Sequence, residues 1–564
     1  NTYLQFEIVK NLFFKTSIGV DLVANNRDTY YSDQTRIGRD GPRDPGPAFG
    51  LRAFELGNRN IVNILNENIL NYSKTFGIHK IDAVVGYTYQ TDDNRFASSS
   101  ARGFTVNDFA QNNIQNGNRT TRETGSGRTQ WVLRSFLGRF NYNLLDKYLL
   151  TVTFRRDGSS RFGANNKWAS FPSVALGWKF KQESFMQNVP FLTDGKLRAS
   201  YGVTGNSELP AYQAISSLGV QSYLIGDAAN PAIFQNRLGN PDLKWETTQM
   251  FNVGLDLSFL NNRLNVTADY FRNQTRDLLL FVQLPPTTGF TSVLKNSGSL
   301  RNTGLEVAVN WVAVDKGDFR WDIMGNVSTL RNEITDLGGT PSFFSYDGSH
   351  LGNQGSYVSV GRPIGGWFGY DYVGIWQSAD EIANNPSIAG IDKPGYARYR
   401  DVNGDRIIDT GDRTYLGDPN PRVIWGFNST VRYKRFDLNF FFRGAHGHKI
   451  RNLQASEHAD GVGNYNQYRT VLENSWTPNN PNATRPIIDA TREFPVFFRR
   501  SNFFIEDGAF VRLQNLALGY TLPSNKYVRN ARIYVSGQNL FVITRYTGWD
   551  PEVSNSGQNN LNRG

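Results

Sequence analysis

The chain has 564 residues, and its composition of 39% hydrophobic, 20% charged and 13% aromatic residues is typical of an ordered protein. Its net charge of +10 is small for this length and the basic residues are scattered singly, so we expect no nucleic-acid partner. No run of about 18 apolar residues is present, which excludes transmembrane helices but not transmembrane strands.

The sequence lacks the signatures of common enzymes. Cysteine is absent, which excludes disulfides, thiol nucleophiles and cysteine-ligated metals. There is no phosphate-binding glycine loop, no Gly-x-Ser-x-Gly elbow and no His-Glu-x-x-His pair. We therefore predict no catalytic residue and no catalytic cofactor, and we do not expect an enzyme. The chain enters strand-like sequence directly at Asn1, and we interpret it as a fragment of a longer protein.

Alternation of apolar and polar residues begins with the first predicted strands, near 3–9 and 12–22, and recurs along the chain. It is clearest from Phe251 to Phe259, where every odd-numbered residue is apolar and every even-numbered residue is polar or glycine. The pattern resumes after a short turn, from Leu264 to Tyr270. A period of two places one set of side chains on each face of a pleated strand, so we predict an all-β protein.

Short and long connections between the predicted strands alternate along the chain. The short ones lie at 10–11, 74–77, 144–146, 260–262, 315–317 and 434. The long polar ones lie at 23–60, 91–129, 207–243, 274–298, 332–420 and 446–501, and the links 159–166 and 182–194 are partial exceptions. A soluble sandwich has no reason to sort its loops in this way, whereas an outer-membrane barrel has short periplasmic turns and long extracellular loops. We predict a large antiparallel transmembrane β-barrel of which about 16 of about 22 strands are present.

The two faces of these strands differ in what they can contact. One face is apolar and suits lipid, and aromatic residues crowd the strand ends as they do in membrane-interface girdles. The other face carries Asn, Asp, Glu, Arg and Thr, and so many polar groups need water or a polar filling instead of a dry core. We expect this second face to line a hydrated or plugged lumen.

Several long stretches resemble the SusC/RagA family of TonB-dependent (TonB-linked) outer-membrane transporters. They cover nearly all of residues 60–555 and follow the order found in the family. The stretches are 157–163, 171–173, 177–178, 197–206, 240–248, 361–365, 507–513, 519–523, 538–540 and 550–552.

This resemblance implies a barrel closed by an N-terminal plug, a TonB box pulled by an energised inner-membrane complex, and a SusD-like surface lipoprotein that caps the outer mouth. Residues 1–564 would then be a partial barrel domain, with the plug, the TonB box and the final strand outside the sequence. The implied function is active import of oligosaccharides or peptides by an integral protein of the bacterial outer membrane, in contact with its lipid. Substrate-binding residues are not identified.

Residues 401–412, within the large extracellular insertion 332–420, resemble a calcium-binding loop. Oxygen ligands at positions 1, 3, 5, 7, 9 and 12 would come from Asp401, Asn403, Asp405, the carbonyl of Ile407, Asp409 and Asp412. Two departures are Arg406, which stands where glycine normally makes the sharp turn, and Asp412, which replaces a glutamate. We predict a structural Ca²⁺ that stiffens an outer loop; the alternative is an Asx-rich turn without an ion.

Two other functions remain open. A passive porin would use the same barrel without a plug. A secreted carbohydrate-binding or glycoside-cleaving β-protein would bury its apolar faces against protein. Glycoside cleavage needs two carboxylates about 5–9 Å apart, and no acidic pair is singled out by its sequence context.

Overall fold

The computed structural model describes the chain from Asn1 to Glu552 with several gaps. The residues left undescribed are 33, 36–51, 105–112, 227, 346–355, 459–465, 490–497, 499, 525, 528, 530 and 553–564. In the described part, no helix is long and apolar enough to cross a membrane.

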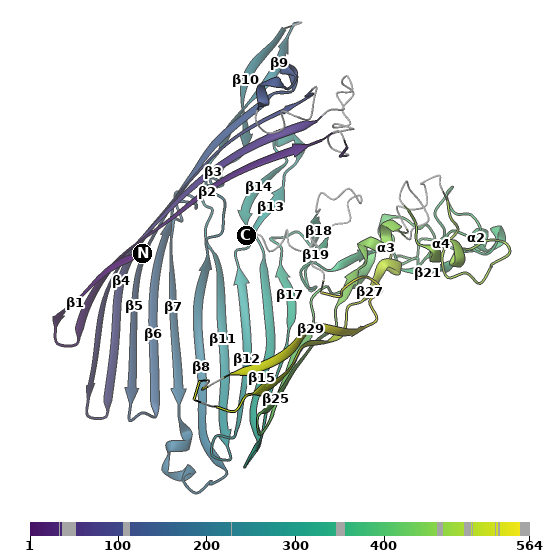
Figure 1. Cartoon of the computed structure of the whole chain (residues 1–564). Helices are drawn as coiled ribbons and strands as arrows, with labels where there is room; N and C mark the ends of the chain where they lie inside the picture. Colours follow the sequence, from purple (N-terminus) through teal and green to yellow (C-terminus); the bar gives the residue numbers. More distant parts are fainter. Residues whose placement is uncertain are drawn as a thin grey trace. The chain divides into compact units, whose positions relative to one another are not determined.

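Seventeen strands form the main antiparallel sheet (Figure 1). They are β1 (Thr2–Val9), β2 (Leu12–Tyr31), β3 (Ala53–Phe76), β4 (His79–Arg102), β5 (Glu123–Leu144), β6 (Tyr148–Ser159), β7 (Trp168–Trp178), β8 (Leu192–Asn206), β11 (Glu246–Phe259), β12 (Leu264–Arg276), β15 (Ser299–Lys316), β16 (Phe319–Thr329), β17 (Arg331–Asp336), β24 (Val423–Tyr433), β25 (Phe436–His446), β28 (Phe510–Thr521) and β29 (Arg532–Thr544). Only Leu330 separates β16 from β17, and both pair with β15. Counted as one interrupted strand, they bring the total to the predicted sixteen.

The chain divides into two units. Unit 1 comprises Asn1–Ala175, Gly202–Thr247 and Leu279–Asn296, and unit 2 comprises Leu176–Tyr201, Thr248–Leu278 and Ser297–Gly564. The division cuts through strands β7, β8 and β11.

Unit 1 holds strands that are much longer than the sequence suggested. Strands β2 to β5 have 20 to 24 residues, whereas about 9–11 residues are enough to cross a membrane. The expectation that 23–60 and 91–129 are loops was therefore wrong for much of their length. The apolar alternation stops there, but backbone pairing continues from Val23 to Tyr31 and from Thr91 to Arg102, because a strand ladder needs hydrogen bonds and no apolar face.

The other long connections of unit 1 also contain short elements. They are η2 (Ile114–Asn116), η3 (Arg119–Thr121), β9 (Ser217–Ile225), β10 (Ala228–Arg237), β13 (Leu279–Gln283), η6 (Pro286–Thr288) and β14 (Ser292–Asn296). β9 pairs with β10, and β13 pairs with β14, so the predicted loops 207–243 and 274–298 each carry a hairpin.

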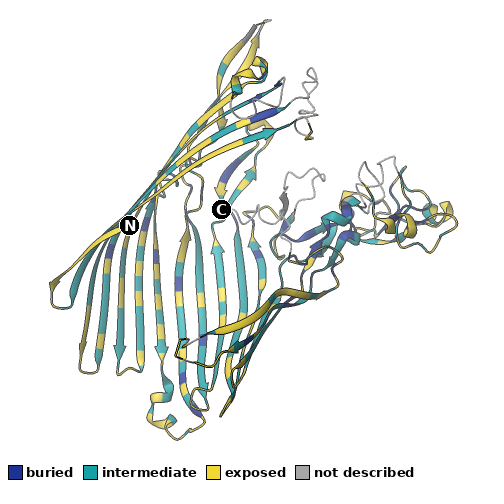
Figure 2. Cartoon of the chain, viewed as in Figure 1, coloured by how far each residue is buried: buried dark blue, intermediate teal, exposed yellow. Residues whose placement is uncertain are grey.

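Pairing in unit 2 separates an apolar face from a polar one. Val266 of β12 lies opposite Val309 of β15, and the neighbouring position pairs Asn265 with Asn310. The same alternation runs across β16, β24, β25, β28 and β29. Figure 2 shows that most strand residues are intermediate or exposed, so the apolar face has no second layer of described protein within its own unit.

All six predicted tight turns are present. Each contains residues in the left-handed backbone region, as two-residue hairpin turns require. These residues are Asn11, Gly77, Leu145, Asp146, Leu260, Asn261, Asn262, Gly317 and Lys434. The medium link predicted at 182–194 starts earlier, after β7 ends at Trp178, and β8 begins at Leu192. This link contains two short helices, η4 (Phe180–Gln182) and η5 (Ser184–Met186).

The long outer connections of unit 2 fold into a small domain with its own core, which we call the loop domain. Its elements are β18 (Ser342–Ser345), β19 (Ser356–Ser359), β20 (Trp367–Gly369), β21 (Tyr372–Ile375), α2 (Ala379–Asn384), β22 (Ala397–Tyr399), η7 (Thr410–Asp412), β23 (Thr414–Gly417), β26 (Lys449–Arg451), α3 (Leu453–His458), α4 (Arg469–Asn474), η8 (Asn502–Phe504) and β27 (Ile505–Asp507). The first residues of the insertion predicted at 332–420 belong to β17, which continues the sheet to Asp336, and the loop domain begins after them.

Candidate functional site

The polar face of unit 2 carries an ion cluster that joins three strands. The Arg198 guanidinium donates hydrogen bonds to Asp256 at 2.8 Å and to Asp269 at 3.1 Å. A Cβ at Gly254 would lie 2.3 Å from an Asp269 oxygen and 2.7 Å from Arg198 Cζ, so glycine leaves the space that this cluster occupies. Charged groups that are paired in this way indicate a wall built to contact water, as the sequence predicted for the lumen.

Amide side chains continue this polar wall across β24, β25 and β28. Asn439 donates at 2.8 Å to both Asn428 and Thr430, and it accepts a hydrogen bond from Asn515 at 3.2 Å. Such a network presents both donors and acceptors, which suits the passage of polar solutes.

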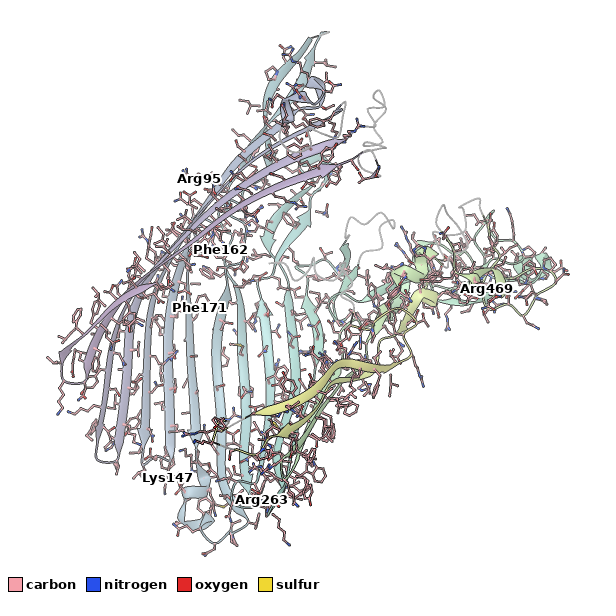
Figure 3. The ribbon with its side chains drawn as sticks, in the orientation of Figure 1. Arg95, Lys147, Phe162, Phe171, Arg263 and Arg469 are labelled. Carbon is pink, nitrogen blue, oxygen red and sulfur yellow. The ribbon has the colours of Figure 1, made fainter. Side chains whose placement is uncertain are left out.

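Three of the family-like stretches meet in one buried cluster of unit 1. Phe162, from stretch 157–163, packs on Trp245, from stretch 240–248, with ring centroids 4.7 Å apart. Phe171 meets the same indole at 5.5 Å with an edge-on ring. The Trp245 indole N–H donates a hydrogen bond to the Lys167 carbonyl at 3.1 Å. Phe162 and Phe171 are labelled in Figure 3. These stretches therefore share a structural task, which is to fix an outer loop against the strands.

Gly163 explains why this cluster can close. Its backbone N–H donates to the Leu243 carbonyl at 2.9 Å, and Asn165 N–H donates to the Pro241 carbonyl at 3.2 Å. A Cβ at Gly163 would lie 2.1 Å from the Pro241 oxygen, so only glycine allows this backbone approach.

A second pair of stretches meets in unit 2. The Arg512 side chain is almost fully buried and forms ion pairs with Asp550 at 2.6 Å and Glu552 at 2.8 Å. Arg512 belongs to stretch 507–513, and both acids belong to 550–552. The pairing fixes the segment after β29 to the outer end of β28, a contact that sequence spacing alone could not reveal.

The loop domain is held by an aromatic core. Its fully buried members include Trp376, Phe498 and Phe504, and both long connections contribute to it. Asp392 is partly buried beside this core, where its carboxylate accepts the Ile388 backbone N–H at 2.7 Å. Burial raises the pKa of Asp392 to about 6, against smaller opposing effects of the Ile388 N–H and the Trp376 indole.

The predicted calcium loop lies at the edge of this domain. Asp401 accepts backbone N–H groups from Gly404 at 2.6 Å and Arg406 at 2.9 Å. Asp412 is buried and accepts Val402 N–H at 2.8 Å and Asp409 N–H at 2.9 Å.

Three further facts bear on the fit of an ion to this loop. Arg406 has φ of 69°, so the sixth position adopts the left-handed turn in spite of its side chain. Asn403, Asp405, Ile407 and Asp409 are exposed. Within the described residues, no three His, Cys, Asp or Glu side chains are gathered as a metal site would gather them. The hydrogen bonds are those of Asx turns, so the calcium loop stays a prediction beside its ion-free alternative.

Comparison with known proteins identifies the family. A profile described as "TonB dependent receptor-like, beta-barrel" matches residues 4–540. This chain belongs to that family. The TonB-dependent receptor P3 of Formosa agariphila is 35% identical over 99% of the chain and 55% of its own length. The TonB-dependent receptor SusC of Bacteroides thetaiotaomicron is 32% identical over 77% of the chain and 42% of its own length.

A solved structure of the RagAB peptide transporter is also similar to this TonB-dependent receptor. It has a TM-score of 0.81 and 26% identity over 98% of the chain and 59% of the solved chain. The chain spans about half the length of the curated relatives that it matches. The family consists of integral outer-membrane receptors and transporters, so the predicted membrane, barrel fold and SusC/RagA resemblance are confirmed.

Proposed function

We propose that this receptor barrel is part of an energised importer that carries oligosaccharides or peptides across the outer membrane. The observation that carries the proposal is the family match over residues 4–540, together with the likeness to SusC and to the RagAB peptide transporter. The polar face supports it, since Arg198 with its two aspartates and the amide network of Asn439 provide a hydrophilic wall.

We propose that the remaining length of the protein supplies a plug and a TonB box. An open barrel of this size would pass solutes in both directions, whereas a plug moved through TonB allows uptake against a gradient. A SusD-like lipoprotein would close the outer mouth. The loop domain supports this partnership. Its core, which contains Trp376, Phe498 and Phe504, holds the outer connections in a fixed conformation, so a partner would bind a surface that is already formed.

The test is uptake by the full-length protein in its own outer membrane. We expect a strain that lacks the gene to lose growth on one class of cargo, either glycans or peptides, when that class is the sole nutrient. Growth should return with the intact gene, but not with a gene whose TonB box is deleted or in a strain without TonB. Uptake that continues without TonB would refute the importer and favour the passive porin.

We also propose that loop 401–412 binds one Ca²⁺ through the side chains of Asp401, Asn403, Asp405, Asp409 and Asp412 and the carbonyl of Ile407. The left-handed turn at Arg406 supports this, because the sixth position of such loops needs that conformation. The ion would stabilise the loop domain and take no part in chemistry.

A further inference from the structure

The outward face of unit 1 carries a group of arginines where its apolar band ends. On β5, this face shows Leu144, Phe140 and Phe136 from the tight turn upward and then changes to Arg134. On β6, it shows Tyr148, Val152 and Phe154 and then Arg156. Since tight turns of outer-membrane barrels are periplasmic, both arginines lie at the outer edge of the band.

Each of these two arginines is exposed and lies against an aromatic ring on the same face. Arg134 Cζ is 5.6 Å from the centroid of Tyr89, and Arg156 Cζ is 5.8 Å from the centroid of Trp168. Trp168 also stacks on Phe136 at 6.0 Å, which ties it to the top of the apolar band. Tyr and Trp rings are enriched where acyl chains meet polar headgroups, so this edge has the composition of a membrane interface.

A second pair of arginines lies farther out on the same face. Arg128 and Arg95 flank Asp93, and both guanidiniums bond its carboxylate, Arg128 at 2.7 Å and Arg95 at 3.1 Å. Their side chains stay 53% and 62% exposed, which leaves N–H donors for an outside ligand. Figure 3 labels Arg95 on the outer part of the long strands and Lys147 at their tight-turn end.

The positive charge of these arginines, and the distance between the two pairs along the membrane normal, limit which ligand can bind them. Between the level of Arg156 and the level of Arg95, the described outward face of β4, β5 and β6 carries four arginines and one aspartate, so its net charge is positive. Six residues separate Arg134 from Arg128, which is about 20 Å along a strand and about 15 Å along the membrane normal for a strand tilted by about 40°. A phospholipid headgroup layer is only about 5–8 Å thick. A ligand that reaches both pairs must therefore carry anionic groups at two depths.

We propose that Arg134, Arg156, Arg128 and Arg95 form a binding surface for the phosphate groups of the outer-leaflet glycolipid. The inner pair contacts phosphates at the base of its headgroup, and the outer pair contacts phosphates on its sugars. Guanidinium groups suit this task because they bind phosphate oxygens in a bidentate manner. The acyl chains of the same lipid cover Phe136, Phe140 and Val152 directly below.

The test measures lipid binding by the full-length protein after delipidation in detergent. The probes are lipopolysaccharide, the same material with its phosphates removed, and inorganic phosphate. The variant is the double substitution Arg134→Gln with Arg156→Gln. Its matched control is Arg139→Gln, an exposed arginine on β5 that pairs with Val84 and Thr153 on the opposite face.

We expect the double variant to bind lipopolysaccharide about 30-fold more weakly, from about 1 kcal/mol for each arginine near an anionic surface. The Arg139→Gln protein should bind normally, and a double lysine variant should recover only part of the affinity, because lysine keeps the charge but not the bidentate geometry. Equal binding by the double glutamine variant and the unchanged protein would overturn the proposal. So would undiminished binding of the dephosphorylated lipid, or displacement of the lipid by millimolar inorganic phosphate, which would indicate a simple anion site.

Discussion

Replacement of Gly163 by alanine tests the buried cluster of unit 1 most severely. The added Cβ would lie 2.1 Å from the Pro241 carbonyl oxygen and 2.4 Å from its carbon, so the backbone of segment 240–245 must move. That movement breaks the hydrogen bond from Gly163 N–H to Leu243 and separates Trp245 from Phe162.

The expected cost follows from these contacts. Overpacking a close site costs about 1–3 kcal/mol, and each lost backbone hydrogen bond adds about 1 kcal/mol. With the bonds of Gly163 and Asn165 both lost, the closed state of this loop should be destabilised by about 3–5 kcal/mol. Since 1.4 kcal/mol is a factor of ten, the open loop should become at least about 100-fold more populated.

Limited trypsin digestion of the full-length protein in native membranes reads out this opening. Cleavage after Lys167 and Lys244 should become much faster in the Gly163→Ala protein, because the rate follows the population of the open loop. Gly138→Ala is the matched control, since its Cβ would meet nothing nearer than Val84 O at 4.0 Å. Cleavage of the Gly163→Ala protein at the rate of the control would refute the reasoning.

Three further predictions concern unit 2. Arg512→Gln should release the segment at Asp550 at a cost of about 1.5–3 kcal/mol, because it removes the charged hydrogen bonds that hold the partly exposed Asp550 and Glu552. Hydrogen exchange around 545–552 measures this release, and unchanged protection would contradict it. The raised pKa of Asp392, about 6 against an ordinary 3.8, means that its proton stabilises the loop domain below about pH 4 and that this contribution is lost as pH rises through 6. Local unfolding of that domain, followed by hydrogen exchange, should therefore cost about 1–2 kcal/mol more at pH 5 than at pH 7.5, and Asp392→Asn should abolish this difference. Chelation of Ca²⁺ should lower the melting temperature of the full-length protein by several degrees but leave that of an Asp405→Ala protein unchanged, because alanine offers no oxygen ligand. Equal melting of the unchanged protein with and without chelator favours the ion-free turn.

The sequence predicts the strands because alternation is a local property. The apolar Val266 and the polar Asn265 show which face of the strand each occupies, whatever residues they pair with. The tight turns at Gly317 and Lys434 can likewise be predicted from the residues next to them. The extension of β2 and β4 could not be predicted, since residues such as Ser98 and Ser99 are typical of loops and form strands here by pairing with distant partners.

The contacts that fix the outer loops were equally hidden from the sequence. Trp245 meets Phe162 across more than eighty residues of chain, and Arg512 meets its acids across nearly forty. The resemblance of these stretches to a family marked them as special, but only the fold shows why. The group of outward arginines could not be recognised in the sequence either, because its members are far apart in the chain and become neighbours only when the strands pair.

The two faces of the sheet are tested most directly at Val84 and Val85, adjacent residues of β4 with the same side chain. Val85 faces outward and is 62% exposed, whereas Val84 pairs with Asn71 and Arg139 on the polar face. The chain has no cysteine, so a single cysteine at either position can carry a spin label in the full-length protein in its membrane. The label at 85 should collide with oxygen dissolved in lipid and be shielded from a water-soluble nickel complex, and the label at 84 should not show this lipid signature. The same lipid signature at both positions, or contact with the nickel complex at 85, would contradict an outward face covered by hydrocarbon.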